Sequence, residues 1–158
     1  MHTRRQLLIA ALSLAPATRA LAHHGWSSFD QGRPVWLEGT ARRVAWRNPH
    51  AEFDLELPAN PELPADLARR VVPAQQSPVD APDLLARARL PLRRDRVWRV
   101  ELAPLTRLQA WGLAGIAEGE AVGVLGFELA DPKAAPLVRA EFLFVAGKAL
   151  GLRSSPTG

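Results

Sequence analysis

The sequence predicts a mainly β protein, a small five-stranded barrel of the oligonucleotide/oligosaccharide-binding (OB) type with one short helix between strands three and four. Five segments carry alternating, β-branched or aromatic residues, and turn-forming residues separate most of them. One short helical segment falls between the third and the fourth. A β-sandwich is the alternative, because it is built from strands of the same kind.

The first two strands are expected to form a hairpin. Residues 35–46 are rich in β-branched and aromatic side chains, and Gly39 in their middle predicts a bulge or a sharp bend. A turn over residues 47–49 leads to the strand 51–57. Apolar and acidic side chains alternate along that strand and lie on opposite faces (Phe53, Leu55 and Leu57; Glu52, Asp54 and Glu56).

A proline-rich insertion interrupts the strands. Residues 58–94 hold seven prolines, a density that a sheet interior or a long helix does not tolerate. We predict a partly disordered surface segment, in which residues 81–90 form a short helix that starts at Asp80 or Asp83.

The strand pattern returns after the insertion. Residues 96–103 alternate, with Trp98, Val100 and Leu102 on one face. Residues 104–111 predict the short helix, with proline at its start and Gly112 at its end. Two more strands are expected over 121–129 and 137–146. Residues 23–153 are thus predicted to form one domain, followed by a flexible tail at 154–158.

The N-terminal 22 residues have the pattern of a cleavable signal peptide. A basic start with Arg4 and Arg5 precedes a short apolar run over 7–16, and Ala20-Leu21-Ala22 supplies the small residues that signal peptidase reads. We therefore expect export to the periplasm, by a Sec or a twin-arginine route, and a mature protein that begins at His23. No later apolar run approaches about 20 residues, so no membrane span is expected after cleavage.

Composition excludes several classes of function. The signal segment holds three arginines and no acidic residue, so removing three from 20 leaves 17 basic residues against 16 acidic ones. This balance gives no reason to expect nucleic-acid binding. The chain has no cysteine, which excludes disulfides, thiolate metal sites and cysteine nucleophiles. No catalytic set stands out, so enzyme activity is unsupported.

The histidines of the mature chain occupy two places. His23 and His24 form its predicted start, and His50 follows a turn at the beginning of a strand. An α-amine with two or three imidazoles is a nitrogen-rich set that suits Cu(II), with Zn(II) or Ni(II) as alternatives. The carboxylates of Glu52 and Glu101 are candidates to orient these ligands from behind or to act as extra ligands, and the alternative is that they are solvated strand residues. The ordinary alternative is a solvated arm and a surface histidine.

The tryptophans offer a different function. Trp26, Trp46 and Trp98 are candidates for a face that holds a peptide, a glycan or a partner protein without any metal. Tryptophans at strand spacing more often serve in core packing.

Three stretches of the chain resemble a known family: the start Ala22-His23-His24-Gly25-Trp26, the loop Trp46-Arg47-Asn48-Pro49-His50, and the run over 98–113. Together they are similar to domain of unknown function 6152, a family of small exported bacterial proteins. The insertion at 58–94 departs from its pattern. The resemblance implies export and a small β-barrel, names no function, and marks His23, His24 and His50 as fixed points.

From these observations we expect a periplasmic protein that binds a transition metal, preferably copper, as a carrier, buffer or sensor. A metal-free binding module is the alternative. An oxygen-activating or redox enzyme with an N-terminal histidine brace ranks third, because such a brace needs a second histidine at a fixed distance.

Overall fold

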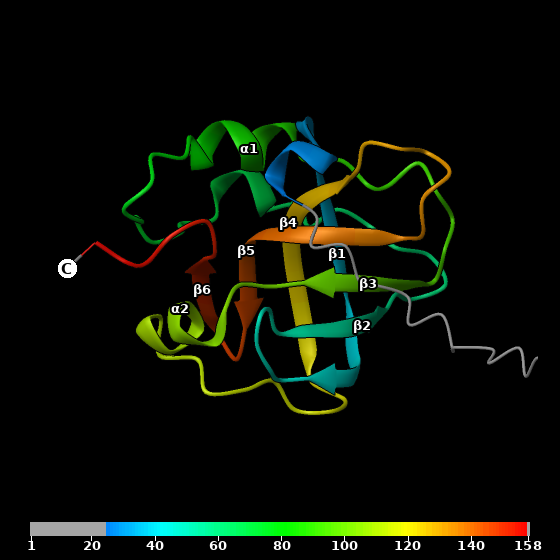
Figure 1. The fold of residues 1–158 in the computed structure, drawn as a ribbon. Coiled ribbons are helices and arrows are strands. Elements are labelled where there is room, and N and C mark those ends of the chain that lie inside the picture. Colours follow the sequence, from blue (N-terminus) through cyan, green and yellow to red (C-terminus); the bar gives the residue numbers. More distant parts are fainter. Residues whose placement is uncertain (1–24, 158) are drawn as a thin grey trace, which may run out of the picture.

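The protein is described by a computed structural model over residues 25–157 (Figure 1). Its elements, in chain order, are η1 (Trp26–Ser28), β1 (Phe29–Ala45), β2 (Glu52–Glu56), η2 (Leu67–Arg69), α1 (Ala81–Arg87), β3 (Val97–Glu101), α2 (Leu105–Ala110), β4 (Ala121–Leu129), β5 (Leu137–Val145) and β6 (Lys148–Gly151).

The strands form one sheet that closes on itself. Their order is β3-β2-β1-β4-β5-β6, and β3 also pairs with β5, so five strands make a ring. The pairs are antiparallel except β3 with β5, which is parallel. The helix α2 lies between β3 and β4 in the chain. The predicted fold class is confirmed: the protein is mainly β, and its ring follows the order of an OB-like barrel rather than two separate sheets.

The strand β6 is an element that the sequence patterns did not predict. It extends the sheet beyond the ring by pairing with β5 alone. A tight turn over Ala146 and Gly147, both with positive φ, reverses the chain between them. The two-residue turn and the four-residue strand are too short to produce a clear alternation.

The strand β1 is longer than predicted and irregular in two places. It begins at Phe29 rather than at residue 35, and its register with β4 shifts between Phe29 and Pro34. The expected bulge at Gly39 is wrong, because the shift against β2 falls at Arg43, which has a φ of 47°. Gly39 is instead a point of close approach, where a Cβ would lie 2.2 Å from the carbonyl oxygen of Glu56.

The ring is packed on both of its faces. The predicted alternation is confirmed, since the apolar side chains of β2 and β3 are buried in the interior (Phe53, Leu55, Trp98 and Val100). A second cluster lies on the outside of β1, β4 and β5 and contains Trp36, Phe127 and Phe142. Leucines from η2 and α1 complete it (Leu67, Leu84 and Leu85).

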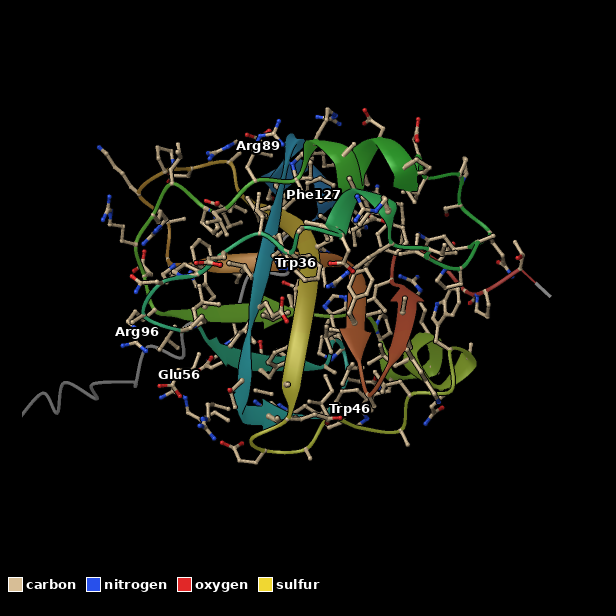
Figure 2. All side chains as sticks on the ribbon, turned by 180° about the vertical axis from the view of Figure 1, so that it is seen from behind. Trp36, Trp46, Glu56, Arg89, Arg96 and Phe127 are labelled. Atoms are coloured by element: carbon tan, nitrogen blue, oxygen red, sulfur yellow. The ribbon has the colours of Figure 1, made fainter. Side chains whose placement is uncertain are left out.

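The proline-rich insertion is therefore an ordered cover over the second cluster, where the sequence predicted a partly disordered segment. The short helix was predicted correctly: Asp80 caps α1 and accepts a hydrogen bond of 3.1 Å from the backbone N–H of Asp83. After α1, Arg89 exchanges backbone hydrogen bonds with Pro34 and Trp36 of β1. Figure 2 shows Arg89, Trp36 and Phe127 in the part of the ring that the insertion covers.

The tail that the sequence predicted to be flexible, residues 154–158, is bonded to the insertion over its described part, residues 154–157. Ser154 accepts a hydrogen bond of 2.7 Å from the backbone N–H of Ser77 and donates its own backbone N–H to Gln75. Gln75 and Pro156 form an isolated bridge. These partners belong to the insertion and lie about 80 positions away, so the local sequence carries no sign of them.

Among residues 25–157, no helix has the length and apolar character that crossing a bilayer requires.

The close approach at Gly39 makes a stability prediction. We expect Gly39→Ala to lower the free energy of unfolding by about 2 kcal/mol or more, because the added methyl group would overlap the β2 backbone. Gly115→Ala is the matched control, since a Cβ there meets nothing within 4 Å, and its effect should stay within about 0.5 kcal/mol. Urea denaturation of both variants measures the difference. Equal stabilities would show that β1 and β2 are not in this contact.

Candidate functional site

His50 is the one predicted metal ligand that falls within the described residues; His23 and His24 lie outside them. It follows the turn between β1 and β2, which contains a cis Asn48–Pro49 peptide bond. The next residue, Ala51, is tied to the end of β3 by backbone hydrogen bonds with Leu102 and Ala103. His50 is thus held at the rim of the ring beside the last residue of β3.

A buried ion pair lies against the His50 ring. The Nδ1 atom of His50 is 3.4 Å from Oε1 of Glu101, and the same oxygen is 3.3 Å from Nη1 of Arg139. Glu101 and Arg139 are neighbours across the parallel pair of β3 and β5, and their exposed fractions are 9% and 8%. His50 keeps 20% of its side chain exposed. The site therefore consists of a buried ion pair and one imidazole that reaches solvent.

Arg139 connects this pair to the beginning of the described chain. Its Cζ atom lies 4.6 Å from the ring centroid of Trp26, and the Cζ atom of Arg153 lies 4.0 Å from the same centroid. Trp26 also meets the edge of Phe127, with 6.3 Å between ring centroids. Two guanidinium groups and one aromatic ring thus fix Trp26 immediately before β1.

Arg139 and Arg153 each pair with a different carboxylate. Arg153 lies 2.6 Å from Glu141, which has no exposed surface and also accepts a hydrogen bond from Gln75. Burial lowers the pKa of Arg139, while the nearby Glu101 carboxylate acts in the opposite direction. Because an arginine starts from so high a pKa, Arg139 stays charged at neutral pH.

The structure separates the two carboxylates, Glu52 and Glu101, that were predicted to support the metal ligands. Glu101 reaches His50, as described above. Glu52 instead pairs with Nη1 of Arg99 at 2.9 Å. Arg99 also contacts Asp54, so it bridges two carboxylates of β2.

The three tryptophans proposed as a ligand face are not gathered together. Trp98 is 1% exposed and belongs to the interior of the ring. Trp26 precedes β1 and Trp46 follows it, so they lie at opposite ends of a strand of 17 residues. Figure 2 shows Trp46 far from Phe127, against which Trp26 packs.

Sequence reasoning missed Arg139 and Arg153. A signal for the first was present, because Arg139 and Glu141 interrupt the apolar pattern of β5. Within residues 25–157, no three His, Asp or Glu side chains come together as a metal-binding group.

The architecture and this site define a mainly β protein with a ring of five strands, a covering insertion and a histidine at the rim. The model of a family of unknown function (DUF6152) matches residues 11–62, which supports membership of the chain in that family. The matched region contains His23, His24 and the Asn48-Pro49-His50 loop. No curated protein matches the chain, and no solved structure matches it.

The buried ion pair makes a second stability prediction. We expect Arg139→Met to cost about 3 kcal/mol, because it leaves Glu101 without its cation in a buried place. The double variant Arg139→Met with Glu101→Gln should lose less stability than the sum of the two single variants, by about 1–3 kcal/mol. The exposed pair Arg87 and Asp83 is the control and should show a coupling below about 0.5 kcal/mol. Additive losses in the buried pair would contradict the contact.

Proposed function

We propose that the protein is exported to the periplasm and binds a transition metal there, preferably Cu(II), as a carrier, buffer or sensor. The ligands are His50, His23 and His24, together with the α-amine of His23 once the signal peptide is removed. One observation carries the proposal: His50 lies against Glu101, and Glu101 is linked through Arg139 to Trp26, three positions after His23.

The contact of His50 with Glu101 suits a metal ligand. A carboxylate beside Nδ1 favours the tautomer that carries its proton on that nitrogen. The lone pair on Nε2 is then available to a metal, in the same way that carboxylates orient ligating histidines elsewhere. The exposed fifth of the His50 side chain gives an ion access to it.

The anchoring of Trp26 supports the participation of the N-terminal histidines. His24 and His23 precede Trp26 by two and three residues, and an extended chain advances by about 3.3–3.6 Å per residue. Contacts of 4.6, 3.3 and 3.4 Å connect Trp26 to His50 through Arg139 and Glu101. The segment before Trp26 therefore starts close enough to His50 for the imidazoles of His23 and His24 to reach the same ion.

The ligand chemistry favours copper. An amine and up to three imidazoles form a set of nitrogen donors, for which Cu(II) has the highest affinity among the divalent ions of its row. Zn(II) and Ni(II) are the alternatives.

A metal-free binding module for a peptide, glycan or partner protein is the second candidate. OB-like barrels commonly bind such ligands on the face of strands two and three. In this protein the outward side chains of β2 pair with arginines of β1 and β3, as Arg42 does with Glu56 and Arg99 with Asp54. Their charges are already compensated, which favours the metal over this candidate.

The first test is a Cu(II) titration of the protein recovered from the periplasm, whose starting residue is read by N-terminal sequencing. We expect a start at His23 and one Cu(II) per chain by calorimetry, with a nitrogen-rich paramagnetic resonance spectrum. His50→Ala and an added N-terminal alanine should each weaken binding, because each disturbs a ligand. A dissociation constant no tighter than about 10 μM would overturn the proposal and leave the metal-free module.

The role of Glu101 is tested separately. We expect Glu101→Gln to weaken Cu(II) binding about 10–100-fold, as the loss of a carboxylate behind a ligating histidine does. Glu52→Gln is the matched control, since Glu52 pairs with Arg99, and it should change the affinity by less than about twofold. Equal effects of the two substitutions would show that Glu101 does not support Cu(II) binding through His50. Unfolding curves of both variants check that each is folded.

A further inference from the structure

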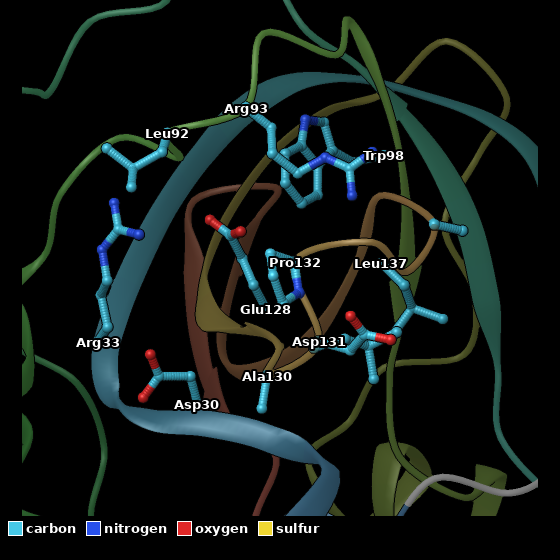
Figure 3. A pocket seen from close by; sticks show the side chains of 12 residues that line it. Asp30, Arg33, Leu92, Arg93, Trp98, Glu128, Ala130, Asp131, Pro132 and Leu137 are labelled. Atoms are coloured by element: carbon cyan, nitrogen blue, oxygen red, sulfur yellow. The ribbon is translucent and has the colours of Figure 1, made fainter.

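A second candidate site lies at the other end of β1 from His50. A cavity of about 150 Å³ opens where β1 begins and β4 ends, and the β4–β5 loop and the start of β3 close its sides. Figure 3 shows the carboxylate of Glu128 directed into this cavity and the side chain of Arg33 across from it. An apolar cavity of about this volume holds a benzene molecule, so a ligand of similar size fits.

Two opposite charges face this cavity without pairing. The Oε1 atom of Glu128 is buried and has no hydrogen-bond partner among residues 25–157. Arg33 makes no ion pair within 4.0 Å in the same part of the chain. The two residues lie on neighbouring strands, but the register of β1 against β4 is irregular between Phe29 and Pro34, where Arg33 sits. A buried oxygen without a donor is costly unless a ligand supplies one.

The other cation of the cavity is already engaged. Arg93 lies 2.8 Å from the carboxylate of Asp95 and donates to the carbonyl oxygen of Ala134. It is therefore less available to neutralise Glu128. Burial raises the pKa of Glu128, although Arg33 and Arg93 act in the opposite direction.

The remaining wall carries two further carboxylates and an apolar surface. Asp30 and Asp131 line it, and each accepts a hydrogen bond from a backbone N–H, of Gly32 and of Lys133 respectively. Trp98 and Leu137 line the cavity from β3 and β5, and Leu129 lines it from the end of β4. Trp98 is 1% exposed, and the Cζ atom of Arg93 lies 5.9 Å from its ring centroid, so Leu129 and Leu137 supply the apolar surface that a ligand can reach. The site thus combines an acceptor for a cation, a donor for an anion and a small apolar surface.

We propose that this cavity binds small zwitterions of the α-amino acid class. The ammonium group contacts Glu128, the carboxylate contacts Arg33, and a short apolar side chain packs against Leu129 and Leu137. A bare metal ion is a poorer match, because among the described residues the carboxylates of this region do not converge as a metal-binding group. A polyatomic ligand reaches both separated charges at once.

The test is calorimetric titration of the metal-free protein with L-alanine and L-valine. We expect a dissociation constant between about 10 μM and 1 mM for at least one of them. Alaninamide lacks the carboxylate and propionate lacks the ammonium, and both should bind at least about tenfold more weakly. Binding of either analogue at full strength would overturn the zwitterion assignment, as would the absence of binding by both amino acids.

Variants locate the site. Glu128→Gln and Arg33→Gln should each weaken amino acid binding at least about tenfold, since each removes one charged contact. Glu62→Gln and Arg69→Gln are exposed controls outside the cavity and should leave the affinity unchanged. His50→Ala should also leave it unchanged, which separates this proposal from the metal site. If Glu128→Gln and Arg33→Gln bind as the unchanged protein does, the cavity is not the site.

Discussion

The parallel pairing of β3 with β5 is the constraint on which the rest of the molecule depends. It closes five strands into a ring, and it is short, covering Arg99 to Glu101 on one strand and Leu137 to Arg139 on the other. The pairing places Glu101 beside Arg139, so the ring closure and the buried ion pair are formed by the same residues. Glu101 also lies beside His50, so the closure of the ring and the surroundings of His50 share one side chain.

Local patterns predicted most of the ring, because its strands alternate between a buried and an outward face. Phe53, Leu55 and Trp98 follow this rule, and the bounds of β4 agree with the prediction. The early start of β1 was not predictable in this way, since Pro34 and its neighbours break the alternation. The order of the insertion also depends on packing between residues distant in sequence, since the second cluster contains both Leu85 and Phe127.

The candidate site was partly predictable for a similar reason. A histidine after a turn at the start of a strand is visible in the sequence, and so is the alternation that places Glu101 outward on β3. The contact between them depends on the attachment of Ala51 to the end of β3. The clamping of Trp26 by Arg139 and Arg153 joins residues more than 100 positions apart.

Trp26 and Arg153 also bring the first and last parts of the described chain into one contact. Arg153 stacks on Trp26, and the residues that follow it are bonded to the insertion. Detaching the segment that holds Arg153 would therefore remove one of the two guanidinium groups that lie over the Trp26 ring. Trp26 is thus a junction at which the start of the described chain, the strand β5 and the segment after β6 meet, and Arg139 connects this junction to Glu101 beside His50.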